Sequence, residues 1–372
     1  MGNNKTIKIF HTADFHLGLH FRTHPEAQET LVQARYETIE RLVDMANDKN
    51  AEILAIAGDL FDKTSMKISE IQKAVQAINR FEGNVVLVLP GNHDYITADS
   101  PLWDRFKKES NDNVLVLDDK IPVDLSEFDL KAVVYPAPCH AKHSTENTTG
   151  WIESADKDPE KVNIGIAHGS IEGLSPDFDQ RYYPMTKREL NDAGVDIWLM
   201  GHTHITWPEK SDKKDIIFNP GTPEPDGFDC RHEGRAFLHT IDDKKTIQTE
   251  ILSTGSYRFR KIEKNLNHEK DLENILKEFE KETYSNSVVK VSVSGVLEPE
   301  LYESWKEQRQ KIRDSVLELK LDDSNLRRKV TEDQIRKEFA EGSFPEQLLS
   351  SFSEKEEDEL QMAYELIREV KK

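Results

Sequence analysis

The stretch Ile53-Leu54-Ala55-Ile56-Ala57-Gly58-Asp59-Leu60-Phe61-Asp62 joins five apolar residues to a glycine and two carboxylates. A short apolar run that ends at glycine is typical of a strand buried on both faces, as in a parallel sheet. Four other strand-like runs also lead directly into Asp, His and Asn residues, in the segments Asp14-Phe15-His16, Gly91-Asn92-His93-Asp94, His168-Gly169 and Gly201-His202-Thr203-His204. Because ligands bind beyond the carboxyl ends of strands in open α/β sheets, we expect these five segments to meet at one site.

Strand-like and helix-like segments alternate in the first part of the chain. The order is a strand over 7–10, a helix over 27–49, a strand over 53–57, a helix over 68–81 and a strand over 85–89. In the second helix, Ile71, Val75 and Ile78 repeat at i, i+4 and i+7 and predict one buried stripe. Later strands follow one another without helices between them, and we interpret them as a second sheet. The pattern predicts an α/β domain.

The composition changes where Ser253-Thr254-Gly255-Ser256 indicates a turn. We therefore expect a catalytic domain over residues 1–255. Residues 256–345 alternate helix and strand signals in the manner of a small α+β domain. Residues 346–372 form a charged helical tail with one apolar face, which fits either packing on its own body or binding to a partner.

Charge and hydropathy restrict the classes of function. The chain has 50 basic and 70 acidic residues and a net charge of −20, which argues against a free-standing binder of duplex nucleic acid. No apolar run approaches the roughly 18 residues that a membrane span requires. The first residues contain no apolar leader with a small-residue cleavage site, so we expect a cytoplasmic protein.

The residue types in the five segments favour binding of divalent metal ions. Asp, His and Asn without Cys suit a borderline-to-hard ion, with Mn²⁺ as our first choice and Fe²⁺, Zn²⁺ or Mg²⁺ as alternatives. The number of ligands is sufficient for two ions. A pair of ions about 3.5 to 4 Å apart can activate a bridging water and stabilise the attacking and leaving oxygens of a displacement at phosphorus. The predicted substrate is therefore a phosphate ester.

These motifs resemble the calcineurin-like metallophosphoesterase superfamily. The chain looks like the DNA-repair exonuclease branch, the SbcD-type nuclease subunits of double-strand-break repair complexes. The resemblance covers about residues 6–255, includes Asn219-Pro220-Gly221-Thr222-Pro223-Glu224 and Arg231-His232-Glu233, and extends more weakly to Pro345. It implies a sandwich of two mixed β-sheets flanked by helices (α/β/β/α), with a small α+β capping domain at the C-terminus.

The resemblance also implies a role for each motif residue. By their positions in the motifs, the ligands are Asp14, His16 and His204 for one ion, Asn92, His168 and His202 for the other, and Asp59 as the bridge. His93 resembles the catalytic histidine of the family, which stabilises the transition state or protonates the leaving oxygen. Asp94 would orient the imidazole of His93.

Three further residues are candidate substrate contacts. His20 and His232 fit the edge of the site, and Asp62 lies beside the expected bridging carboxylate. The break-repair nucleases often have a histidine at the position of Asp62, and that position is linked to exonuclease activity. Asp62 is therefore a departure that bears on substrate handling rather than on the metal ions.

Three functions remain open from the sequence. The first is a Mn²⁺-dependent DNA nuclease of DNA repair that acts with an SMC-like coiled-coil ATPase of the SbcC type and, by resemblance, as a homodimer. The second is a phosphodiesterase or phosphatase for small molecules such as cyclic nucleotides, for which the net charge of −20 is no obstacle. The third is a scaffold that keeps the fold, although a scaffold has no need of the complete ligand set.

Overall fold

The computed structural model describes residues 6–175, 177, 179–212, 214–281, 284–352 and 356–370. The chain divides into two compact units, Met1–Phe259 and Arg260–Lys372. The first ends four residues after the boundary we expected at 255, and the second includes both the expected α+β domain and the expected tail. Residues 353–355 and 371–372 of that tail lie outside the described part. Within the described part, none of the helices is both long and apolar enough to cross a membrane.

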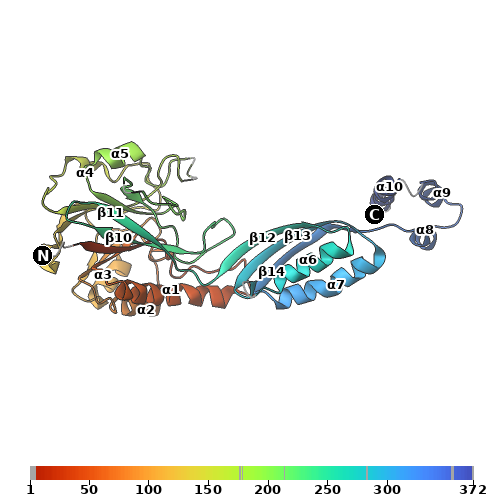
Figure 1. Cartoon of the computed structure of the whole chain (residues 1–372), viewed down its shortest axis with the longest axis horizontal. Coiled ribbons are helices and arrows are strands. Elements are labelled where there is room, and N and C mark those ends of the chain that lie inside the picture. Colours follow the sequence, from red (N-terminus) through yellow and green to blue (C-terminus); the bar gives the residue numbers. More distant parts are fainter. Residues whose placement is uncertain are drawn as a thin grey trace. The chain divides into compact units, whose positions relative to one another are not determined.

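The first unit contains two mixed β-sheets (Figure 1). The six-stranded sheet has the order β11-β10-β1-β2-β3-β4, with β1 (Ile7–Thr12), β2 (Ile53–Ala57), β3 (Val85–Leu89), β4 (Val114–Val116), β10 (Arg235–Ile241) and β11 (Ile247–Ser253). The five-stranded sheet has the order β5-β6-β7-β8-β9, with β5 (Val123–Asp124), β6 (Ala132–Ala137), β7 (Val162–His168), β8 (Ile197–Gly201) and β9 (Ile217–Phe218).

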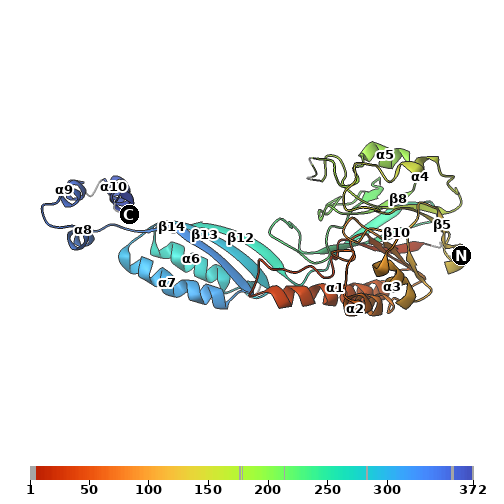
Figure 2. The same ribbon diagram turned by 180° about the vertical axis from the view of Figure 1, so that it is seen from behind.

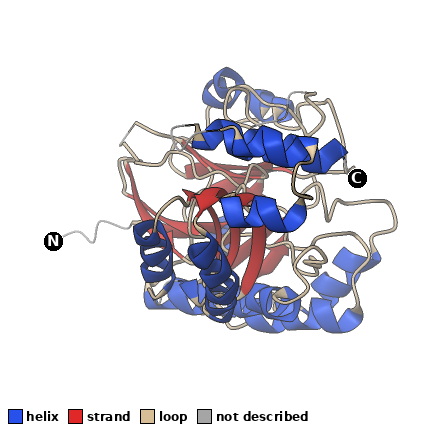
Figure 3. Ribbon diagram, turned by 90° about the vertical axis from the view of Figure 1, so that its right-hand side faces the viewer, coloured by secondary structure: helices blue, strands red, loops and turns tan. Residues whose placement is uncertain are grey.

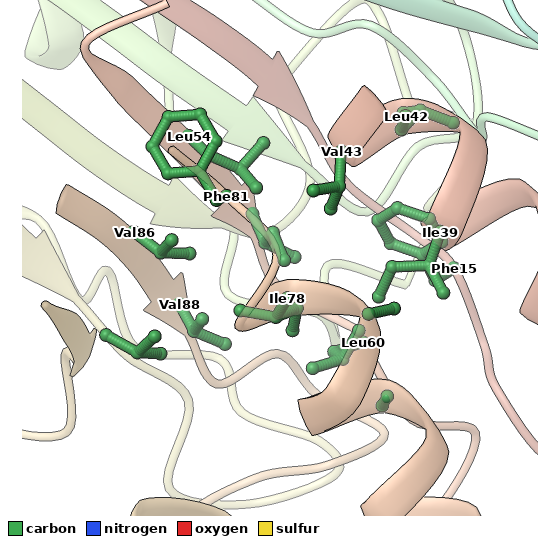
Figure 4. Packing of buried hydrophobic residues seen from close by; sticks show 14 of the residues in the cluster. Phe15, Ile39, Leu42, Val43, Leu54, Leu60, Ile78, Phe81, Val86 and Val88 are labelled. Atoms are coloured by element: carbon green, nitrogen blue, oxygen red, sulfur yellow. The ribbon is translucent and has the colours of Figure 1, made fainter. Parts of the chain in front are cut away.

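Helices cover the outer face of each sheet (Figures 1 and 3). They are α1 (Gln28–Asp48), α2 (Ile68–Ile78) and α3 (Pro101–Glu109) on the six-stranded sheet, and α4 (Gly150–Ser154) and α5 (Lys187–Asp192) on the other, with the short 3₁₀ helix η1 (Leu125–Phe128) after β5. Ile39 of α1 and Ile78 of α2 pack against Leu54 of β2 and Val88 of β3 (Figure 4). Figure 2 shows α4 and α5 beside β8 from behind. The α/β/β/α architecture expected from the sequence is confirmed.

The main core lies between the two sheets. Ile9, Ala55 and Leu87 of the first sheet pack in one cluster with Ile164 and Leu199 of the second. All five residues of β2 are buried, because helices lie on one face of this strand and the second sheet lies on the other. This explains why its sequence is continuously apolar rather than alternating.

The interpretation of all later strands as a second sheet was wrong for β10 and β11. They pair antiparallel with each other, and β10 pairs antiparallel with β1 of the first sheet. The pairing places Ile241 beside Ile7 and directs Phe237 into the core between the sheets. The remaining edge of β1 is thereby covered.

The second unit contains a three-stranded sheet of order β12-β13-β14, with β12 (Arg258–Asn265), β13 (Ser287–Leu297) and β14 (Glu318–Arg328). The helices α6 (Glu269–Phe279) and α7 (Pro299–Asp314) bury residues such as Ile275 and Trp305 against it. The three last helices, α8 (Glu332–Glu338), α9 (Phe344–Ser350) and α10 (Glu357–Val370), form a separate small cluster around Ile335 and Tyr364. The expected helix and strand content of the α+β domain is present.

Candidate metal centre

The five segments meet where β1, β2, β3, β7 and β8 end. Their Asp and His side chains form three groups whose ligand atoms lie within 4.8 Å of one another. The groups are Asp14, His16 and His204; His16, Asp59 and His93; and Asp59, His168 and His202. The first group is the set expected for one ion, and the third contains the two histidines expected for the other ion together with Asp59, the expected bridge. The second group adds His93, which we did not expect to be a ligand. Residues that are up to about 190 positions apart in the sequence thus share one site.

Asp14 and Asp59 are fully buried carboxylates held by backbone N–H groups. Both oxygens of Asp14 accept from the backbone N–H of His202 at 3.0 Å. Oδ1 of Asp59 accepts from the backbone N–H of His93 at 2.8 Å. The second oxygen of Asp59 lies 3.2 Å from Nε2 of His168 and 3.6 Å from Nε2 of His16. Asp59 therefore has one oxygen between the two histidines, as a bridging ligand requires.

Asn92 provides the oxygen around which the second ligand group gathers. Its Oδ1 lies 3.0 Å from Nε2 of His168 and 3.0 Å from Nδ1 of His202. The Nδ1–H of His168 donates to the carbonyl oxygen of Ala57 at 2.9 Å, so Nε2 is the ring nitrogen that faces Asn92 and is available to a metal ion. A hydrogen bond at the far nitrogen is the usual way in which a metal-binding histidine is oriented.

His16 and His204 direct ring nitrogens at each other. Their Nε2 atoms are 3.0 Å apart, and Nδ1 of His204 donates to Oδ2 of Asp226 at 2.7 Å. Nδ1 of His16 is buried without a hydrogen-bond partner, 3.7 Å from Oδ1 of Asp62. Two imidazole nitrogens at this separation repel each other unless a proton or a cation lies between them. The nitrogen and oxygen donors therefore fit the two divalent ions predicted from the sequence.

The backbone of the centre is strained at the ligands themselves. Left-handed φ angles between 47° and 96° occur at Asp14, His16, Asp59, His202 and His204. Such angles are uncommon outside glycine and concentrate at functional sites. Gly58 and Gly91 have a related role, because a Cβ atom at Gly58 would lie 2.0 Å from Nδ1 of His168 and one at Gly91 would lie 2.2 Å from Oδ1 of Asp59. Any larger residue would occupy the space of a ligand.

The buried carboxylates and imidazoles of the centre shift one another's pKa values. Burial raises the pKa of Asp14. Burial alone would also raise the pKa of Asp59, but the neighbouring His168 and His16 outweigh it and lower that pKa. Burial opposes protonation of His168 and His204, yet the carboxylates beside them, led by Asp59 and Asp226, raise both pKa values to about 9. Carboxylates that favour positive charge on the neighbouring histidines also favour a bound divalent cation.

His93 lies against this centre with one ring nitrogen engaged. Its Nδ1–H donates to the carbonyl oxygen of Asp62 at 3.0 Å, and its ring meets that of His16 edge to face at a centroid distance of 4.7 Å. Asp94 does not have the orienting role that we expected. Its carboxylate accepts from the backbone N–H groups of Phe61 at 3.0 Å and Gly91 at 2.7 Å, so it braces the two loops that carry Asp59 and His93.

The three candidate substrate contacts have different surroundings. Asp62 is partly buried, and its carboxylate lies 3.7 Å from His16 and from His93. His232 is buried, and its Nε2 donates to the carbonyl oxygen of His204 at 3.0 Å, so it supports a ligand loop from behind. His20 is exposed and belongs to none of the three ligand groups.

Sequence reasoning missed Asp226 and Tyr182. Asp226 lies two residues beyond the Asn219-to-Glu224 stretch that was singled out, in a loop rich in proline and glycine, and nothing local marks it as the partner of His204. Tyr182 was not among the candidate site residues. Its ring lies 5.1 Å from the ring of His202 and 5.0 Å from that of His143, and it is only partly buried.

Sequence comparison places this arrangement among known proteins. The profile of the family described as calcineurin-like phosphoesterase matches residues 7–206, more than half of the chain. The chain belongs to this family. This calcineurin-like phosphoesterase thus combines the family's fold with His/Asp groups that fit two metal ions.

Three curated relatives are similar to part of this phosphoesterase. It is 26% identical over 228 residues to "Uncharacterized metallophosphoesterase YhaO" of Bacillus subtilis, which covers 59% of the chain and 53% of that protein. It is 27% identical to "DNA double-strand break repair protein Mre11" of Methanopyrus kandleri, over 59% of the chain and 49% of that protein. The protein of the same name from Saccharolobus solfataricus is 24% identical over 67% of the chain and 63% of its own length. The chain thus matches half to about three fifths of the length of these relatives.

Proposed function

We propose that this phosphoesterase is a DNA nuclease subunit that cleaves phosphodiester bonds with two bound Mn²⁺ ions. The observation that carries the hydrolytic part is that Asp59 belongs to two of the ligand groups, one of which also contains His93. When bound, two such ions lower the pKa of a shared water and neutralise charge on the phosphoryl oxygens. All ligand residues needed for this chemistry are on one chain.

The side chains around the centre have separate roles in binding and catalysis. The Asp14 carboxylate and the Asp59 carboxylate hold the centre through backbone N–H groups that come from the other loops of the site. His93, with Nδ1–H fixed on the carbonyl of Asp62, keeps Nε2 for the substrate, where it can stabilise the transition state or give a proton to the leaving oxygen. Asp226 holds the ring of His204 in the orientation that directs Nε2 at the centre.

The choice of DNA rests on two observations. Two of the relatives, at 24% and 27% identity, carry the name of a double-strand break repair protein. In addition, the ring of Tyr182 lies next to that of His202, and the ring of His143 lies next to that of Tyr182. These aromatic rings provide a surface on which an unpaired base can stack. A nucleotide chain is a substrate that uses both features.

The charge of the chain is the reason for proposing a partner. A net charge of −20 is poorly suited to holding a duplex alone. We therefore propose that an SMC-like coiled-coil ATPase of the SbcC type supplies the basic surface and that the pair acts on DNA in the cytoplasm, with two copies of the nuclease subunit. Co-purification of the chain with such an ATPase, encoded nearby, would test this part separately.

The test of the nuclease activity uses the purified chain with Mn²⁺ and DNA of several forms: blunt duplex, duplex with either overhang, and single strands. We expect cleavage that chelator abolishes and that Mn²⁺ restores. The matched variant is His93→Ala, which we expect to bind two ions and to lose cleavage. If neither the chain alone nor the chain with its ATPase cleaves any of these substrates, the nuclease proposal is wrong.

Asp62 favours a second candidate function, a phosphodiesterase for small molecules such as cyclic nucleotides. Its carboxylate lies at the edge of the centre, 3.7 Å from His93, where it repels the phosphates of a long nucleic acid more than it hinders a single small ester. Rapid turnover of small phosphodiesters together with no cleavage of DNA would favour this alternative. Under the nuclease proposal, Asp62→His increases exonuclease cleavage.

A further inference from the structure

Two histidines lie completely buried between the sheets of the first unit, outside the metal centre. His11 comes from β1 and His239 from β10, and both side chains are without solvent exposure. Nδ1 of His11 lies 3.3 Å from Nε2 of His239. Burial lowers the pKa of His11 to about 3 and that of His239 well below its usual value, so both rings are neutral. A neutral histidine has one N–H donor and one acceptor nitrogen.

The hydrogen bonds of the two rings have a single consistent direction. Nε2 of His11 lies 3.1 Å from the carbonyl oxygen of Met200 and must donate to it. Nδ1 of His11 then accepts from Nε2–H of His239, and Nδ1 of His239 accepts from the hydroxyl of Thr249 at 2.8 Å. The chain of bonds therefore runs from β11 through β10 and β1 of one sheet to β8 of the other. Every polar atom in it is paired.

This series of hydrogen bonds crosses between the sheets at residues close in sequence to the metal ligands. His11 precedes the ligand Asp14 by three residues, and Met200 precedes the ligand His202 by two. Immediately above it the sheets are in contact, because a Cβ atom on Gly201 would lie 2.1 Å from the carbonyl oxygen of Ala57. The bond between His11 and Met200 thus joins the two strands that deliver Asp14 and His202.

The position of the metal ligands depends on the contact between β1 and β8. The first sheet supplies Asp14 and His16, whereas β8 of the second supplies His202 and His204. The distance between these two sets is set by how β1 and β8 lie against each other. We propose that His11 and His239 are positioning residues of the metal centre, which fix β8 against β1 so that ligands from both sheets bind the same pair of ions.

The test measures metal binding directly, without substrate, so it succeeds or fails independently of the nuclease proposal and rests only on the dimetal site. His11→Phe keeps a ring among the aromatic neighbours of His11 but removes the bond to Met200. Loss of a group that orients metal ligands typically weakens metal affinity by about 10- to 100-fold, and we expect this range for Mn²⁺ by calorimetric titration of the full chain. His11→Gln, whose amide N–H can reach the same carbonyl, should restore affinity.

Two further variants make the result decisive. Ile241→Ala empties part of the same core at the opposite end of β10, beside Ile7, and should lower the melting temperature without changing Mn²⁺ affinity. Thr249→Val keeps both rings and removes only the hydroxyl that orients His239; it serves if His11→Phe does not fold, and we expect a smaller but measurable loss of affinity. The proposal is overturned if the folded His11→Phe or Thr249→Val variant binds both ions as the wild type does, or if Ile241→Ala loses as much affinity as His11→Phe.

Discussion

Replacing Gly58 with alanine tests how closely the backbone of the metal centre is packed around its ligands. Gly58 has a φ of +94°, and a Cβ atom there would lie 2.0 Å from Nδ1 and 2.4 Å from Cγ of His168. No Cβ atom is tolerated at such distances, so the imidazole of His168 must move. That movement breaks the hydrogen bond from His168 to the carbonyl oxygen of Ala57 and takes Nε2 away from Asn92 and Asp59.

The expected magnitude has two parts. A left-handed backbone costs alanine about 1 to 2 kcal/mol relative to glycine. The broken hydrogen bond of His168 adds about 1 kcal/mol, and the displacement of a packed ring adds more, so we expect a total loss in the free energy of unfolding of about 3 kcal/mol or above. Because His168 is displaced, Mn²⁺ affinity should also fall by about 10- to 100-fold.

Gly173→Ala is the matched control. Gly173 also has a left-handed φ, +77°, but nothing lies within 4 Å of the place where a Cβ atom would be. The Gly173→Ala variant should therefore lose only the backbone contribution to the free energy of unfolding, about 1 to 2 kcal/mol, and keep its metal affinity. Both variants are compared by urea unfolding in chelator and by Mn²⁺ titration. If Gly58→Ala is no more destabilised than Gly173→Ala and binds metal equally well, the close packing around His168 described above is incorrect.

Three further predictions concern the site and its support. Under saturating Mn²⁺, His93→Ala should retain two bound ions by elemental analysis and lose about 10²- to 10⁴-fold in turnover; loss of an ion would make His93 a ligand instead. Asp226→Asn should weaken Mn²⁺ binding about 10-fold or more in a titration, because the ring of His204 loses its charged partner, and unchanged binding would contradict this. Burial lowers the pKa of His11 to about 3, so the contribution of neutral His11 to the free energy of unfolding is complete above the unfolded pKa of about 6.5. As the pH falls below that value the contribution decreases, by about 2 kcal/mol at pH 5. The stability of His11→Phe should therefore fall less between pH 7 and pH 5 than that of the wild type, and an identical pH dependence would refute this prediction.

The sequence predicted the fold best where burial leaves a simple pattern. The central strands β2 and β3 are apolar on both faces, so their continuous runs identified them, and the stripe of Ile71, Val75 and Ile78 identified α2. The assignment of β10 and β11 failed because pairing is not a local property. Nothing within Arg235–Ile241 indicates that this strand returns to β1 rather than extending the sheet of β8.

In the candidate site, too, local features could be predicted from the sequence and long-range contacts could not. Each metal-binding segment follows a strand and carries unusual residue types, so the segments could be recognised and expected to converge. The hydrogen-bond partners of these residues could not be predicted from the sequence. Asp94 is next to His93 in sequence, yet its carboxylate bonds to Phe61 and Gly91, because the loops after β2 and β3 turn toward each other. Asp226 reaches His204 only through the path of a loop after β9.

His11 and His239 are the clearest case of a feature hidden from the sequence. In a strand, a single histidine among apolar residues is usually an internal residue with a satisfied hydrogen bond, and that description is correct for both. Their proposed role in positioning the ligands depends on which carbonyl oxygen accepts the hydrogen bond from His11. Only the crossing of β1 and β8 places Met200, two residues before a metal ligand, within reach of His11.

The measurement that tests the central claim most directly is cleavage of DNA by the chelator-treated chain as Mn²⁺ is added back, with bound metal counted in the same samples. Our account predicts that cleavage appears only as occupancy approaches two ions per chain, and that His93→Ala reaches the same occupancy without cleavage. Cleavage that is complete at one ion or below would contradict the two-ion site. Two bound ions without hydrolysis of DNA, alone or with the ATPase partner, would contradict the proposed function.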